Sequence, residues 1–231
     1  MNRRERFFSC MNRTGYDRLP IMHPYGTPEF QAKLHARVGM DDAQLRAALE
    51  HVFESVCPKQ VVPNPIPPNF GDYPEGSYAG GWGEIYAPQA YGTGENAGHY
   101  GEAAYLPFAE ITDPAQLKDY PWPSADSFDY SGIREECIAI KERGGVALYC
   151  PFSFDFINNI GRTRGVTQTL MDIGLRDPVF LLLLQKRFEF HYEMDRRVFA
   201  AADGEIDVVH LCEDLGGQNG PLISMPTFNE L

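Results

Sequence analysis

The sequence has few cysteines and tryptophans and no surplus of positive charge. Its 231 residues include 5 Cys and 2 Trp, and 20 Lys and Arg stand against 32 Asp and Glu, for a formal net charge of −12. A nucleic-acid binder needs a basic surface, and an anionic membrane attracts basic segments, so the composition argues against both partners. An anionic substrate would need a local cluster of arginines.

Disulfide pairing and membrane insertion are also disfavoured. The five cysteines are scattered, and no Cys-x-x-Cys pair occurs. Such spacing is not that of a disulfide framework and favours a reducing compartment. The longest apolar run, Val179 to Leu184, is far shorter than the roughly 20 residues of a membrane span. No apolar stretch follows the charged N-terminus, so we expect no signal peptide and a cytoplasmic protein.

Proline, glycine and tyrosine are abundant, with 18, 22 and 12 residues, and they concentrate in residues 58–107. Structureless loops of this length are uncommon in compact domains, so the segment is predicted to be a functional excursion or a set of short hairpins. Residues 81–86 and 101–106 are expected to pair. The hydrophobic fraction of 43% is that of a globular chain, and the length suffices for a sizeable core.

Residues 1–129 are predicted to hold helices, a first strand and this Pro/Gly/Tyr-rich excursion. The first helix covers residues 3–11 and the first strand residues 19–22. Thr27 and Pro28 are a capping hydroxyl and a first-turn proline, so a second helix should run from there to Gly39. A third helix follows Asp41. Residues 56–62 form a strand broken by a proline, and a short helix begins at residue 113.

Residues 130–231 alternate between helix and strand. Helices are predicted over 131–143, 153–160, 166–174 and 177–202, and strands over 146–149 and 206–211, with a further helix from Ser224. This βα pattern implies a parallel sheet. We therefore expect one α/β domain over residues 1–231. A (β/α)8 barrel needs about 250 residues, and only two clear βα units are present, so the barrel is expected to be incomplete at its C-terminus. The alternative is a complete small α/β domain.

Several segments occur in an order that is typical of one enzyme family. They are Arg3-Arg4-Glu5-Arg6, residues 16–21 (YDRLPI), Trp82-Gly83, residues 119–123 (DYPWP), residues 145–154 and residues 213–224 (EDLGGQNGPLIS). Together these segments resemble the uroporphyrinogen decarboxylase superfamily, which also contains methyltransferases that move a methyl group between a corrinoid and a thiol. The resemblance covers nearly the whole chain and implies a (β/α)8 (TIM) barrel and a cytoplasmic enzyme.

The resemblance separates two branches of that family. Decarboxylases carry an Arg-Gln-Ala-Gly-Arg segment after the first strand, whereas residues 22–27 read MHPYGT here. A tyrosine that the family has after Pro151 is also missing. A porphyrinogen with many carboxylates needs several guanidinium groups, so methyl transfer is the first hypothesis. Decarboxylation of a porphyrinogen or another polycarboxylate is the second. The third is an inactive barrel fragment with an open sheet edge.

The methyltransferase branch implies further groups. The resemblance implies a corrinoid as substrate, a corrinoid protein as partner, and a zinc ion on a His-x-Cys pair and a distant cysteine, which keeps a thiol as thiolate. The family's zinc ligands would follow the segment at which this chain ends. His210 and Cys212 form a His-x-Cys pair on an earlier strand. Filling of the barrel interior is the favoured role of that pair, and no metal site is assigned.

Asp214 is the predicted catalytic residue. It follows a predicted strand and precedes a glycine-rich loop, and the carboxyl ends of barrel strands carry the chemistry. It would accept a hydrogen bond or a proton, although a carboxylate here also caps loop N–H groups. Gly216 and Gly217 of the loop are predicted to contact substrate. Glu213 is predicted to point to the opposite face.

The remaining candidates would bind substrate. Arg162 and Arg164 lie in a predicted turn between helices, where they would hold a carboxylate, sulfonate or phosphate, or else form salt bridges. Aromatic residues after the strand at Val146 would line a pocket or fill the core, and a histidine ends the first strand. These candidates are Tyr149, Phe152, Phe154 and His23. The charged side chains of the long helix, including His191, Glu193 and Asp195, are predicted to face solvent.

Overall fold

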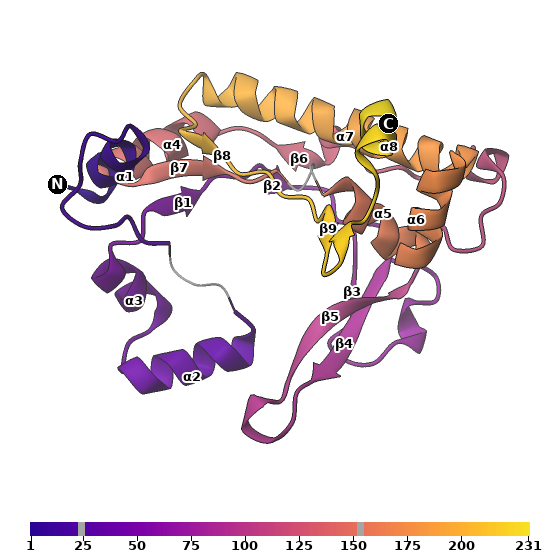
Figure 1. The fold of residues 1–231 in the computed structure, drawn as a ribbon, viewed down its shortest axis with the longest axis horizontal. Coiled ribbons are helices and arrows are strands. Elements are labelled where there is room, and N and C mark those ends of the chain that lie inside the picture. Colours follow the sequence, from indigo (N-terminus) through magenta and orange to yellow (C-terminus); the bar gives the residue numbers. More distant parts are fainter. Residues whose placement is uncertain (23–25, 152–154) are drawn as a thin grey trace.

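The computed structural model describes residues 1–22, 26–151 and 155–231, and these form a mixed α/β fold (Figure 1). The helices are α1 Arg3–Met11, α2 Pro28–Val38, α3 Asp42–Leu49, α4 Ile133–Glu142, α5 Phe156–Arg164, α6 Val166–Leu175, α7 Pro178–Ala202 and α8 Met225–Glu230. Short 3-10 turns lie at Phe70–Asp72, Gly94–Asn96, Pro114–Leu117 and Ala125–Ser127.

A parallel sheet organises the fold. It contains β1 Phe53–Ser55, β7 Val146–Tyr149 and β8 Val208–Val209, in the order β1-β7-β8. All four residues of β7 are buried, which is expected of a central strand covered on both faces. Ile21 extends the sheet by a parallel bridge to His51. Among the described residues the sheet does not close into a barrel.

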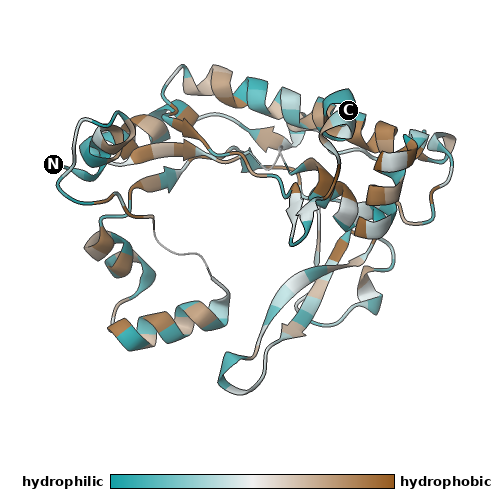
Figure 2. Ribbon diagram, viewed as in Figure 1, coloured by the Kyte–Doolittle hydropathy of each residue, from teal (hydrophilic) through white to brown (hydrophobic). Residues whose placement is uncertain are grey.

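The sheet packs against α4 and α7. Apolar residues of these elements form one core cluster, composed of Val56, Ile133, Cys137, Ile140, Ala147, Tyr149, Val198 and Ala202. Figure 2 shows that β7 is largely hydrophobic along its length, while α7 alternates between hydrophobic and hydrophilic residues. Helix α7 begins where Asp177 accepts hydrogen bonds from the N–H groups of Val179 and Phe180 and Pro178 occupies the first turn.

Helices α5, α6 and the start of α7 enclose a second core cluster. Its buried members are Phe108, Leu117, Ile160, Ile173, Val179, Phe180 and Leu183. Arg164 and Asp172 form an ion pair inside it, and Arg164 also donates to the carbonyl oxygens of Phe108 and Ile111. This pair joins α5 and α6 to the loop before Pro114.

The Pro/Gly/Tyr-rich segment contains a three-stranded antiparallel sheet. Its strands are β3 Tyr78–Ala79, β4 Ile85–Tyr91 and β5 Gly98–Tyr105, in the order β3-β4-β5. The β4–β5 hairpin extends away from the body of the molecule (Figure 1). Two smaller antiparallel pairs join β2 Lys59–Gln60 to β6 Phe128–Asp129, and β9 Gly216–Gly217 to β10 Gly220–Pro221. The hairpin predicted for residues 81–86 and 101–106 is confirmed only in part, because Ile85 and Tyr86 pair with Tyr105 and Ala103 while the rest of the first strand lies beyond residue 86.

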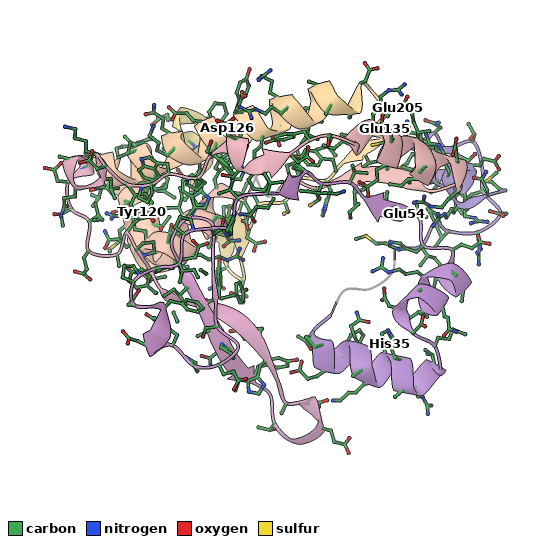
Figure 3. The ribbon with its side chains drawn as sticks, turned by 180° about the vertical axis from the view of Figure 1, so that it is seen from behind. His35, Glu54, Tyr120, Asp126, Glu135 and Glu205 are labelled. Atoms are coloured by element: carbon green, nitrogen blue, oxygen red, sulfur yellow. The ribbon has the colours of Figure 1, made fainter. Side chains whose placement is uncertain are left out.

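Ion pairs attach α1 to the sheet. Arg3 bonds to Glu54 of β1, and Arg4 bonds to Asp207, which also accepts a hydrogen bond of 2.8 Å from the N–H of Ala147. Figure 3 shows Glu54 at one end of the molecule and Tyr120 at the other, near the base of the hairpin. The first helix is therefore held by residues from the middle and the far end of the chain.

Four local predictions are wrong. The strand predicted over 19–22 is only a bridge at Ile21, and the strand predicted over 56–62 is reduced to Lys59–Gln60 because β1 ends at Ser55. The predicted strand over 206–211 is reduced to Val208–Val209, because pairing with β7 ends at Tyr149. The predicted turn at Arg162 and Arg164 is instead the last turn of α5, and only Gly165, at a φ of 96°, separates α5 from α6. In the described part of the chain, no helix is long and apolar enough to cross a membrane.

Candidate functional site

A large cavity lies where the carboxyl ends of β1 and β7 meet β3–β5 and the helices α5 and α7. Its volume is about 920 Å³. Aromatic side chains contribute part of its wall, and they are Tyr78, Trp82, Tyr86, Tyr100, Trp122, Phe128, Tyr149 and Phe190. A cavity of this size and apolar character suits a small organic molecule.

Arg187 of α7 lines this cavity and is almost completely buried. Only 3% of the residue is exposed, and its Cζ atom lies 4.3 Å from the centre of the Trp82 ring. Its Nη2 donates to the carbonyl oxygen of Asn159 at 2.7 Å and to Thr163 at 3.2 Å. Burial lowers the pKa of Arg187 to about 10, which the nearby carboxylate of Glu84 partly offsets. The side chain still carries a full positive charge at neutral pH.

Arg162 supplies a second guanidinium to the same cavity. It lies on α5, where Nη1 contacts the oxygen of Asn159 at 3.2 Å and Asp155 at 3.7 Å. The charge of Arg162 lowers the pKa of Arg187, so the two positive groups are close enough to repel each other. Guanidinium groups pair well with anionic groups, and here the two arginines share the cavity with the carboxylates of Glu84 and Glu102.

Glu84 and Glu102 are acidic residues that line the cavity, and Glu84 follows Trp82 in a tight turn. Its carboxylate accepts from the N–H of Trp82 at 2.9 Å and from the hydroxyl of Tyr86 at 3.3 Å. Burial first, and then the charge of Glu84, raise the pKa of Tyr86 to about 12. The Tyr86 hydroxyl is therefore a stable hydrogen-bond donor at neutral pH.

His191 of α7 also lines the cavity, in contrast to the predicted solvent-facing position. It lies against the rings of Trp82, Phe156 and Phe190. Burial, with the charge of Arg187, lowers the pKa of His191 to about 4, so the imidazole is neutral at pH 7. Asp195, one turn later, accepts a hydrogen bond of 2.7 Å from the hydroxyl of Tyr149. Glu193 does reach the outer surface, where it pairs with Arg196 and Arg197.

Only some of the predicted site residues lie at the cavity. Tyr149 and Arg162 line the cavity, whereas Arg164 is buried in its pair with Asp172. His23, Phe152 and Phe154 lie outside the described residues. Gly216 and Gly217 form β9 at the exposed surface. Asp214 accepts a hydrogen bond of 2.9 Å from the amide of Asn158, which does line the cavity.

Glu213 takes part in a half-buried acidic pair that the sequence pattern did not indicate. It accepts a hydrogen bond of 3.1 Å from the N–H of Ile157, at the start of α5. Burial first, and then the neighbouring carboxyl of Asp155, raise the pKa of Glu213. Because Asp155 also contacts Arg162, this acidic pair lies next to an arginine that lines the cavity.

The residues weighed as zinc ligands lie near one another but do not form a metal site. The Sγ atom of Cys150 lies 3.6 Å from Nδ1 of His210, and the charge of Cys212 acts on Cys150. Across the described ranges, no group of three or more His, Cys, Asp or Glu residues is arranged to hold a metal ion. The described residues therefore do not fit zinc.

Sequence reasoning missed the buried arginine, the neutral histidine and Glu84. Arg187 and His191 occur at a spacing of four on α7, a spacing that places both on one helix face. That pattern was a usable signal, but it does not reveal that the face is covered by Trp82.

No family model matches the chain, and comparison with curated proteins and with solved structures finds no match.

Proposed function

We propose that the cavity binds an organic substrate with one or two anionic groups, in an enzyme of the uroporphyrinogen decarboxylase type. The anionic character of the substrate is inferred from Arg162 and Arg187, which line the cavity together beside aromatic rings. The three parallel strands with helices α4 and α7 are compatible with part of a (β/α)8 barrel. In such barrels the substrate lies at the carboxyl ends of the strands, where this cavity opens.

Methyl transfer between a corrinoid and an anionic thiol is the reaction that we favour. Two guanidinium groups would neutralise a small thiol carboxylate or sulfonate, but a porphyrinogen has more carboxylates than they can pair. The arginines would fix the charged end, and the aromatic wall would exclude water from the sulfur. Because the described residues do not fit zinc, no step of the reaction is assigned to that metal.

The test compares two thiols that differ in charge. Binding of 3-mercaptopropionate and of neutral 2-mercaptoethanol would be measured by titration calorimetry. We expect the carboxylate to bind more tightly, and Arg162→Gln to weaken it about tenfold or more, as charge-assisted hydrogen bonds are lost. Arg176→Gln removes an arginine that pairs with Glu230 away from the cavity, so it should bind like the wild type.

Turnover is tested separately from binding. The protein would be mixed with methylcobalamin and each thiol, and loss of the methyl group from cobalt would be followed by absorbance. We expect demethylation with the anionic thiol and an impaired rate in Arg162→Gln. Equal binding of both thiols contradicts the anion site, whereas tight binding without demethylation contradicts methyl transfer alone.

Decarboxylation is the second candidate, and the acidic pair favours it. Loss of carbon dioxide leaves a carbanion that must receive a proton, and the raised pKa of Glu213, next to Asp155, would suit a proton donor. Release of carbon dioxide from uroporphyrinogen, abolished in Glu213→Gln, would support this reaction. Absence of both turnover and product binding would reject it.

A further inference from the structure

Three chemically active side chains lie in one row across the ends of the parallel strands. In the β1–β7 register Ser55 pairs with Leu148, and two residues further along each strand are Cys57 and Cys150. In the β7–β8 register Tyr149 pairs with Val209, so the next position brings Cys150 beside His210. Residues at one register position project to the same face of a sheet.

Hydrogen bonds support this alignment beyond the paired residues. The N–H of Val56 donates to the carbonyl of Leu148 at 2.8 Å, and the N–H of His210 donates to the carbonyl of Tyr149 at 2.9 Å. Adjacent strands lie about 4.8 Å apart, which falls within the Cα separation of about 4.4–6.8 Å that a disulfide needs. Cys57 and Cys150 therefore lie within reach of each other.

The pair is also accessible to a small molecule. Both cysteines line the cavity, and Cys57 is exposed while Cys150 is half-buried. Burial raises the pKa of Cys57, and the charge of Cys150 raises it further, as expected for two neighbouring thiols. The Sγ atom of Cys150 lies 3.6 Å from Nδ1 of His210. Burial also raises the pKa of Cys150, so exchange at this pair depends on the adjacent imidazole as a proton acceptor.

We propose that Cys57 and Cys150 form a dithiol site at the wall of the cavity, which exchanges with low-molecular-weight disulfides. This site is independent of the methyl-transfer and decarboxylation reactions. Its substrate class is an organic disulfide small enough to enter the cavity. Its oxidised form would covalently join the ends of β1 and β7 at the wall of the cavity.

The exchange proceeds in two balanced steps. The thiolate of Cys57 attacks one sulfur of a disulfide RSSR, which breaks that S–S bond, forms a mixed disulfide and releases RS⁻. His210 takes the thiol proton of Cys150, and the resulting thiolate attacks the sulfur of Cys57 and expels the second RS⁻. Each RS⁻ takes up one of the two thiol protons. Two protein thiols are oxidised, and one RSSR is reduced to two RSH.

The test uses oxidised glutathione on the full chain, followed by alkylation, trypsin digestion and mass spectrometry. The tryptic peptides Ala47–Lys59 and Gly144–Arg162 each contain one of the two cysteines. We expect a linked product of these peptides, lighter than their sum by two hydrogen atoms. Cys57→Ser and Cys150→Ser should each abolish this product. Cys10→Ser and Cys212→Ser should retain it, and circular dichroism would check that all variants fold.

A disulfide between a different pair of cysteines is the competing outcome. The structure also places Cys212 near Cys150. A dominant link between the peptides of Cys150 and Cys212 would overturn the proposal. So would stable glutathione adducts on Cys57 and Cys150 without a link between them, because adjacent thiols should resolve the mixed disulfide.

Discussion

At the scale of single residues, the cavity depends on charges that are held out of water. Arg187 retains its proton because Glu84 and the face of the Trp82 ring partly replace its hydration. The same positive charge acts on His191, which it helps to keep neutral. The cavity therefore presents cationic arginines and an uncharged imidazole at neutral pH.

His191 should make stability depend on pH. Its pKa is about 4 in the folded protein and about 6.5 when unfolded, so the unfolded state binds more protons between these values. The contribution of His191 to stability is thus fully present above pH 6.5. It falls as the pH drops to 4, and the loss is roughly 3 kcal/mol. Urea unfolding at several pH values would measure it.

The variant His191→Gln isolates this contribution from that of the carboxylates. The difference in unfolding free energy between wild type and variant should shrink as the pH falls from 6.5 to 4. Tyr192→Phe changes the adjacent, exposed residue of α7 and should keep the wild-type slope. A constant difference between wild type and His191→Gln would show that the imidazole is not neutralised by burial.

At the scale of elements, local signals define the helices and long-range contacts define the site. Thr27 and Gly39 bound α2 as predicted, because capping depends on a few neighbouring residues. The brevity of β8 could not be predicted, since it depends on where its partner β7 ends. The Arg187–Trp82 contact joins residues far apart in sequence, and no local pattern encodes it.

Two helical glycines allow a matched comparison of α5 and α6. Gly174 lies in α6, and a methyl group there would meet nothing within 4 Å, so Gly174→Ala should stabilise the protein by about 0.5–1 kcal/mol. In Gly161→Ala the new methyl would lie 3.1 Å from Val166, at the tight α5–α6 junction. We expect that variant to be less stable than wild type by about 1 kcal/mol. Thermal and urea unfolding would check both; a gain in Gly161→Ala would mean that the junction relaxes freely.

At the scale of the whole molecule, the cavity that holds Arg162 and Arg187 belongs to a protein with a net charge of −12. If the proposed anion binds there, long-range repulsion should slow its approach, whereas Arg162 and Arg187 would pair with it inside the cavity. The Debye length falls from about 30 Å at 0.01 M salt to about 8 Å at 0.15 M, so added salt screens the distant acids more than the cavity contacts.

The association rate of an anionic ligand should therefore rise as salt increases over this range. Stopped-flow measurements with 3-mercaptopropionate, following the fluorescence of the two tryptophans near the cavity, would test this expectation. Neutral 2-mercaptoethanol serves as the control and should show little change. A rate that falls with salt would mean that Arg162 and Arg187 dominate the field even at a distance.

The ion pair between Arg4 and Asp207 has a consequence for synthesis. A ribosome adds about 5–20 residues per second, so Arg4 precedes its partner by about 10–40 s, whereas a helix forms in about a microsecond. During that interval α1 lacks the carboxylate that also receives the N–H of Ala147. The contact between α1 and Asp207 therefore forms only after Asp207 has emerged, whereas the pair between Arg3 and Glu54 can form much earlier.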